Sequence, residues 1–102
     1  MPTYILLSNL TDEGAKTLKA KPQRLQEVNK EIERYGAKVT AQYAVLGPYD
    51  FLSIVDAPDN ETIARVSVEL GARGSVRLLT LPAIPVANFV RNLKDTDKGA
   101  GD

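Results

Sequence analysis

The chain has no cysteine and no histidine among its 102 residues. Without cysteine there is no disulfide, no thiolate nucleophile and no Cys-ligated zinc or iron–sulfur site. Without histidine the chain lacks the commonest general base near neutral pH, the commonest metal ligand and any triad built on imidazole. We therefore expect neither a metal nor a cofactor. Any catalysis would have to use tyrosine, aspartate, arginine or asparagine.

The chain also lacks an excess of charge and a long apolar run. Thirteen basic and thirteen acidic residues give a formal net charge of zero, which argues against an electrostatically driven nucleic-acid or membrane partner. The apolar run from Tyr4 to Leu7 is too short for a signal peptide, and no stretch approaches a membrane span. A cytoplasmic protein is therefore expected.

Hydrophobic periodicity predicts four strands, at residues 3–8, 37–46, 51–56 and 75–81. Helices are predicted at 12–20 and 23–35, interrupted at Pro22, and then at 60–71 and 86–93. Residues 1–93 are expected to form one domain. The segment 94–102 has no apolar anchor and is predicted to be a disordered tail.

The order β-α-β-β-α-β predicts an α+β, ferredoxin-like fold, with an antiparallel sheet, both helices on one face and a short C-terminal helix. The first three strands carry apolar residues on both faces, so one face would be an exposed apolar patch in a monomer. A homodimer, or an assembly of dimers, that packs sheet to sheet would bury that patch. The stripe of the last helix would reach over the partner or close an open end; it consists of Val86, Phe89, Val90 and Leu93.

The motif Gly47-Pro48-Tyr49-Asp50 joins the two central strands. With the opening Pro2-Thr3-Tyr4, the corner Asn9-Leu10-Thr11, the pair Gln42-Tyr43 and the loop 71–74, it resembles the GYD-domain proteins, a family of small uncharacterised bacterial proteins, over about residues 2–93. The resemblance implies a dimeric α/β-barrel. That group includes cofactor-independent monooxygenases, isomerases, dehydratases and plain binding modules, and the resemblance carries over no catalytic residue.

The turn itself is the first candidate site. Tyr49 and Asp50, with Tyr43, place phenols beside a carboxylate, which could hold a polar ligand or act as an acid/base pair if the carboxylate is desolvated. The alternative is structural, because an aspartate in a turn commonly accepts hydrogen bonds from backbone N–H groups.

A cleft between the first helix and the sheet is the second candidate. Tyr4, Asn9, Thr11 and Tyr43 could line its mouth as ligand-binding residues. Alternatively, the two tyrosines are core aromatics whose hydroxyls are satisfied at the rim.

The third candidate is the glycine-rich loop that ends in Arg73 and Arg77, a weaker candidate for anion binding. Its alternative is a glycine C-cap with Arg73 at the negative end of the helix dipole.

These patterns favour a homo-oligomeric module that binds a small molecule. The alternatives are a cofactor-independent oxygenase or isomerase of the dimeric α/β-barrel type and a purely structural or interaction protein. Whether the chain is an enzyme stays open, because a shared fold does not decide function.

Overall fold

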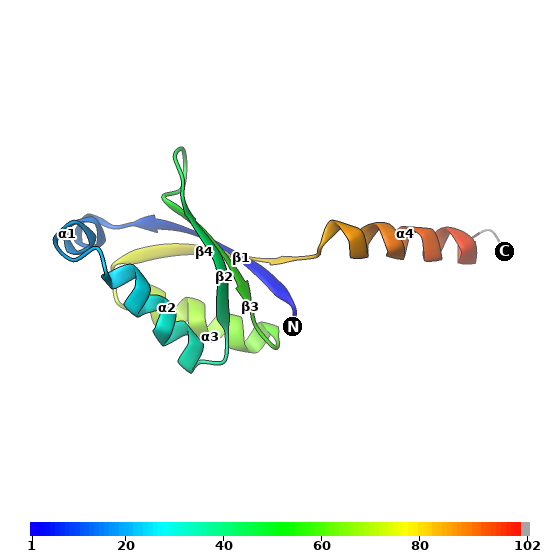
Figure 1. Cartoon of the computed structure of the whole chain (residues 1–102), viewed down its shortest axis with the longest axis horizontal. Coiled ribbons are helices and arrows are strands. Elements are labelled where there is room, and N and C mark those ends of the chain that lie inside the picture. Colours follow the sequence, from blue (N-terminus) through cyan, green and yellow to red (C-terminus); the bar gives the residue numbers. More distant parts are fainter. Residues whose placement is uncertain (101–102) are drawn as a thin grey trace.

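A four-stranded antiparallel sheet organises the structure, a computed structural model that describes residues 1–100 and the side chains of residues 1–95 (Figure 1). Its strands, β1 (Thr3–Leu10), β2 (Lys38–Ala44), β3 (Phe51–Asp56) and β4 (Val76–Ala83), lie in the order β2-β3-β1-β4. Every neighbouring pair is antiparallel. This order is that of the ferredoxin-like fold, so the predicted fold class is confirmed.

Three helices belong to the sheet: α1 (Asp12–Ala20), α2 (Arg24–Arg34) and α3 (Asn60–Gly71). Figure 1 shows α2 and α3 beneath one face of the sheet and α1 at one end of it. Thr11 caps α1 by accepting a hydrogen bond from the Gly14 N–H, and Asp59 caps α3 by accepting one from the Thr62 N–H. Pro22 separates α1 from α2, as predicted.

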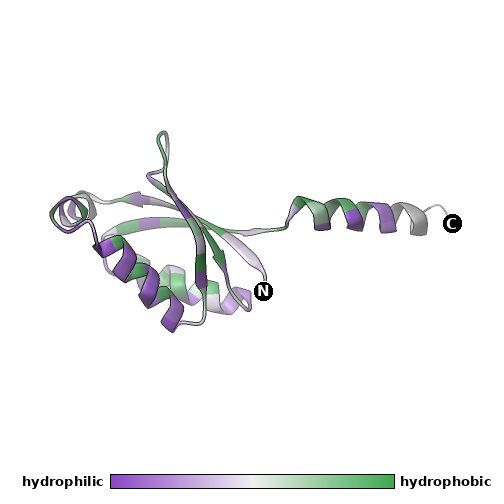
Figure 2. Ribbon diagram, viewed as in Figure 1, coloured by the Kyte–Doolittle hydropathy of each residue, from purple (hydrophilic) through white to green (hydrophobic). Residues whose placement is uncertain are grey.

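The core lies between the sheet and these helices. Val55 on β3 and Val66 on α3 are fully buried, and Tyr4, Leu6 and Ile32 are nearly so. Figure 2 shows hydrophilic residues along the outer surface of α2, as expected for an amphipathic helix over a core. The opposite face of the sheet has no described helix over it.

Gly14 allows α1 to approach the start of β4. A Cβ atom at this position would collide with the backbone carbonyl oxygen of Ser75. The same oxygen accepts a hydrogen bond from the Thr11 N–H, and the Thr11 hydroxyl donates one to the Gly74 carbonyl. This corner therefore ties the end of β1 to the loop before β4.

A bulge in β2 changes the predicted faces of that strand. Val39 pairs with Val55, but Ala41 pairs with Ile54, so one extra residue, Thr40, lies between them. Since a one-residue shift moves side chains to the other face of a sheet, Val39 faces the helices while Ala41 faces away. Strict alternation along the predicted strand 37–46 would place these two residues on one face, and the bulge overturns that expectation.

The chain also departs from its predicted boundaries near both ends of the domain. β1 continues to Leu10, and β4 runs through Pro82, which an edge strand tolerates because it leaves one side of its ladder unpaired.

The last helix, α4, spans Val86–Ala100 rather than ending at residue 93. It stands apart from the sheet (Figure 1). The predicted tail 94–102 therefore begins inside α4, and residues 101–102 lie outside the described residues. Within the described part of the chain, no helix is both long and apolar enough to cross a membrane.

Candidate functional site

A cavity of about 120 Å³ lies between the sheet and the helices α1 and α2. Its wall is mostly apolar, with Leu6 and Phe51 from the sheet and Leu18, Leu25 and Val28 from the helices. The cavity is partly open to solvent, so a small molecule can enter it. A cavity of this size in so small a domain is therefore a candidate ligand site.

A chain of polar side chains forms one wall of the cavity. The Asn29 side-chain amide donates a hydrogen bond of 2.9 Å to Gln42 Oε1, and Gln42 Nε2 donates one of 3.0 Å to the Ser53 hydroxyl. Ser53 is 7% exposed and Ser8, on the neighbouring strand, is 9% exposed. All four residues line the cavity. They can donate and accept hydrogen bonds, and none of them carries a charge.

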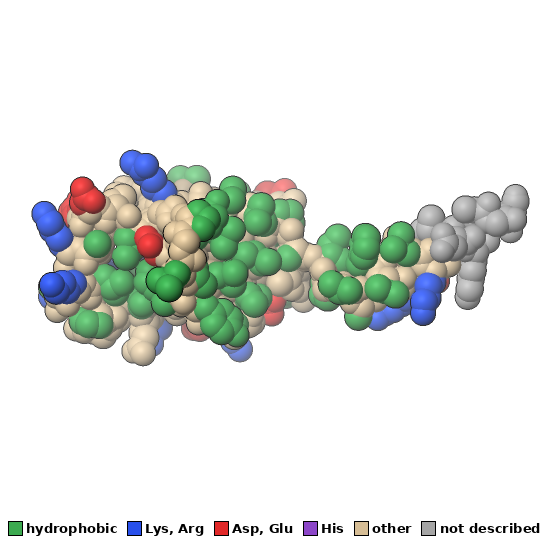
Figure 3. Space-filling view, turned by 90° about the horizontal axis from the view of Figure 1, so that it is seen from above, with side chains coloured by type: hydrophobic (Ala, Val, Ile, Leu, Met, Phe, Trp, Pro, Cys, Tyr) green, Lys and Arg blue, Asp and Glu red, His purple; other side chains and the backbone are tan. Residues whose placement is uncertain are grey.

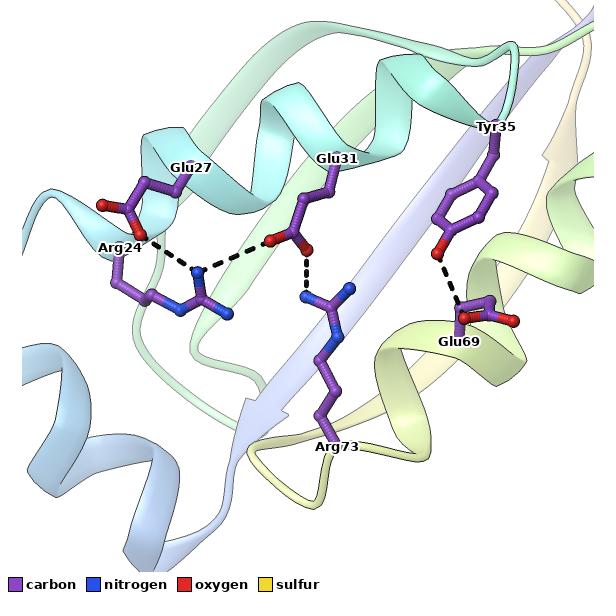
Figure 4. Close-up of polar contacts among 6 residues, drawn as sticks. All are labelled: Arg24, Glu27, Glu31, Tyr35, Glu69 and Arg73. Carbon is purple, nitrogen blue, oxygen red and sulfur yellow. Dashed lines mark hydrogen bonds and ion pairs between the residues drawn. The ribbon is translucent and has the colours of Figure 1, made fainter.

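Charged residues near the cavity are paired with one another (Figure 4). Arg24 Nη1 lies 3.0 Å from Glu27 Oε2 and 3.5 Å from Glu31 Oε1, and Arg73 pairs with Glu31 from the loop after α3. Burial alone would raise the pKa of the Glu31 carboxyl. The hydrogen bond and charge of Arg73, assisted by Arg24, outweigh that effect and hold the pKa below its ordinary value of 4.5. Glu31 is thus an ionised link between α2 and the loop after α3.

Asp50 has a structural contact in the turn. Its Oδ2 accepts a 2.8 Å hydrogen bond from the Leu10 N–H, and its own N–H donates to the Ser8 carbonyl. These bonds attach the loop 45–50 to the end of β1, in line with the structural alternative. Tyr49 is half-buried in the same loop, and neither residue lines the cavity. A functional role for this pair stays a prediction.

The residues expected at a cleft mouth are dispersed. Tyr4 is buried on the helix side of the sheet, and its hydroxyl donates a 2.6 Å hydrogen bond to Asn60 Oδ1. Tyr43 is 58% exposed on β2. Neither tyrosine lines the cavity, and neither does Asn9 or Thr11. Of the predicted residues, Arg73 does line it, but its guanidinium is paired with Glu31.

A shallow groove at the end of β1 does bring together Asn9, Thr11 and Arg77. Asp12 and Glu13 line the same groove. Since these carboxylates would repel an anion, the groove is a poor anion site. Anion binding by Arg73 and Arg77 stays a prediction, and the geometry does not strengthen it.

The four residues of the polar wall were absent from the predicted site: Ser8, Asn29, Gln42 and Ser53. The sequence carries a signal for two of them, because Ser8 and Ser53 interrupt otherwise apolar strands. Gln42 could not be placed, because the bulge in β2 decides which way it faces. Asn29 carries a signal of another kind, because it stands four residues after Leu25 and three before Ile32, on the apolar face of α2.

The face of the sheet opposite the helices carries two apolar rows that cross all four strands. One row is Ala41, Ile54, Ile5 and Leu81, and the other is Tyr43, Leu52, Leu7 and Leu79. We call these eight residues the open face. Figure 3 looks onto this side of the molecule and shows hydrophobic side chains gathered there and along the first part of α4.

Comparisons with known proteins agree with the fold. The family model described as the GYD domain matches residues 4–93. A Thermus thermophilus protein named "Glutamine synthetase and cystathionine beta-lyase binding protein" is 57% identical over 95 residues, which is 92% of this chain and 100% of the relative. The crystal structure of TTHA0845, also from Thermus thermophilus, matches with a TM-score of 0.55 and 25% identity, covering 83% of this chain and 95% of the other. The family resemblance seen in the sequence is thereby confirmed.

Proposed function

Because this chain belongs to the GYD domain family, we propose that it is a protein-binding module that works as a homodimer, with its subunits paired through the open face. The observation that carries this proposal is the pair of apolar rows across the sheet. Soluble monomers rarely leave a continuous apolar patch of this kind in water. A second copy offers the same patch, so a twofold arrangement buries both at once.

Polar residues bound the open face at both ends of the strands. Thr3 pairs with Asp56 at one end, and Asn9 pairs with Arg77 at the other. An apolar centre with a polar rim is the usual anatomy of a protein–protein interface. The patch therefore has a defined extent, matched to the sheet of another subunit.

Two further segments would enlarge this interface. The loop 45–50 rises from the open-face side of the sheet in Figure 1, and Leu46 in it is 99% exposed. On α4, the stripe Val86, Phe89, Val90 and Leu93 is exposed along with Ile84 before it. A specific interface buries about 800 Å² on each partner. We infer that loop and helix both contact the second subunit, and that α4 reaches over it.

The relative's name supports a role in protein binding. That protein is named for binding glutamine synthetase and cystathionine beta-lyase, and it matches this chain along its whole length. We propose that this chain likewise binds enzymes of these two kinds. The expected cytoplasmic location stays a prediction.

Substitution on the open face tests the proposal. Leu52→Lys puts a charge at the centre of one row, so the variant should sediment as a folded monomer while the native chain sediments as a dimer. The control is Val68→Lys, which changes an equally apolar but 70% exposed residue on α3 and should leave the dimer intact.

Surface-immobilised glutamine synthetase and cystathionine beta-lyase then test partner binding. A native chain that binds neither enzyme would contradict that part of the proposal.

Small-molecule binding is the second candidate function, and the cavity supports it. The hydroxyls and amides in its polar wall do not titrate near neutral pH, so they suit binding better than acid–base catalysis. For this reason we favour a binding role over an oxygenase or isomerase. Native mass spectrometry of freshly purified protein tests it: a retained mass on each chain supports the role, and the bare chain mass argues against a tightly held ligand.

A further inference from the structure

The cavity is partly open to solvent, and its volume suits a small occupant. An engineered apolar cavity of roughly 150 Å³ in another protein holds one benzene molecule, and this cavity measures about 120 Å³. A ligand of about six non-hydrogen atoms is therefore the right scale. The apolar part of the wall, which includes Leu6, Leu25 and Phe51, would surround the body of such a ligand.

The Ser8 hydroxyl is available for a hydrogen bond inside the cavity. It is 9% exposed and lines the cavity, yet its hydroxyl has no hydrogen-bond partner among the described residues. The Ser8 oxygen itself is not fully buried, so water or a ligand in the cavity can reach it. Gln42 and Asn29 are already bonded to each other, and Gln42 to Ser53. The free hydroxyl therefore marks where the polar end of a ligand would sit.

The charges around the cavity select a neutral ligand. The two arginines in its lining, Arg24 and Arg73, are both paired with Glu31, and Arg24 also with Glu27. A charged ligand would lose part of its hydration and find no free counter-ion, which is unfavourable. The polar wall offers only hydroxyls and amides, which pair well with an uncharged head group.

The geometry points to a ligand of one chemical class: a neutral molecule of about six non-hydrogen atoms, with a branched or cyclic apolar body and a single amide or hydroxyl head that bonds to Ser8. This inference rests on the second candidate function, because it specifies what that cavity binds. It does not depend on the dimer, because a single chain supplies every residue that lines the cavity.

Isobutyramide and isobutyrate test the inference, because they have the same shape and differ in charge. Each is titrated into the full-length ¹⁵N-labelled protein while the side-chain amide signals of Asn29 and Gln42 are followed by NMR. Isobutyramide should shift these signals saturably, and isobutyrate should bind at least about tenfold more weakly because its charge must be buried. Ser8→Ala should weaken isobutyramide binding about fivefold, the usual worth of one hydrogen bond.

Control measurements distinguish a failure of this inference from a failure of the proposed small-molecule function. Thr3→Ala removes a hydroxyl from the same strand outside the cavity lining, and it should bind isobutyramide like the native chain. Equal or tighter binding of isobutyrate, or native affinity in Ser8→Ala, would overturn the ligand class while leaving a binding cavity. No shift with either probe would overturn the inference outright. Native mass spectrometry tests the broader small-molecule function independently.

Discussion

Leu7 on β1 lies directly opposite Leu52 on β3, and both side chains point away from the helices. Tyr43 and Leu79 extend the same row to the two edge strands. A sheet that buries one face under helices can leave its other face to water, and then that face is usually polar. Here it is apolar, and this contrast leads to the proposed dimer.

The C-terminal helix should contribute to self-association. Phe89→Ser removes an aromatic residue from the stripe of α4, and the dimer dissociation constant should rise on the order of tenfold, because buried aromatics dominate interface energies. Lys94→Ser, outside the stripe, should leave it unchanged. Analytical ultracentrifugation over a concentration series measures both. Equal constants for the two variants would show that α4 does not contact the second subunit.

Gly14 should be intolerant of any side chain. Gly14→Ala forces a methyl group against the Ser75 carbonyl, so the free energy of unfolding should fall by about 1–3 kcal/mol. Gly71→Ala is the matched control, since a Cβ there meets nothing, and it should be neutral or slightly stabilising. Urea denaturation followed by circular dichroism measures the change. A Gly14→Ala variant as stable as the native chain would contradict this packing.

Asp50 should stabilise the fold. Asp50→Ala removes the acceptor for the Leu10 N–H, and the free energy of unfolding should fall by about 1–2 kcal/mol. Asp50→Asn keeps an acceptor oxygen and should lose less. Tyr49→Phe in the same loop should have little effect, because its hydroxyl has no hydrogen-bond partner among the described residues. Thermal melts compare the three variants. Native stability in Asp50→Ala would favour the ligand-binding alternative for this turn.

Glu31 should make stability depend on pH in the acid range. Its pKa is lower in the folded chain than its ordinary value of 4.5, so the folded state favours the ionised form. The resulting stabilisation is present above that value and is lost as the pH falls through the lowered pKa. Glu31→Gln should therefore flatten the dependence of the urea midpoint on pH below about 5. Glu27→Gln, which alters a more exposed partner of Arg24, is the control with the same change in net charge. Identical pH profiles for native chain and Glu31→Gln would rule out this role.

Local chemistry made most of the fold predictable. Thr11 and Asp59 are capping residues, Pro22 breaks a helix, and alternation marks the strands. Thr40 was not predictable as a bulge, because the choice between pairing and bulging depends on the packing of β2 against β3. The same bulge turns Gln42 toward Ser53.

The candidate site was less predictable than the fold. The side chains that line the cavity come from separate strands and helices, and only tertiary structure brings Ser8 and Asn29 to the same space. Tyr49 and Asp50 stood out because polar groups in a motif are conspicuous. Their contacts depend on where β1 ends, and no local pattern reveals that position.

The mass of the native chain in solution tests the central claim most directly. Light scattering coupled to size exclusion, at micromolar concentration, should give twice the 11.1 kDa of one chain, or a higher even multiple if dimers assemble further. A single species of 11.1 kDa would contradict pairing through the open face, and with it the proposal that the apolar rows of the sheet form a dimer interface.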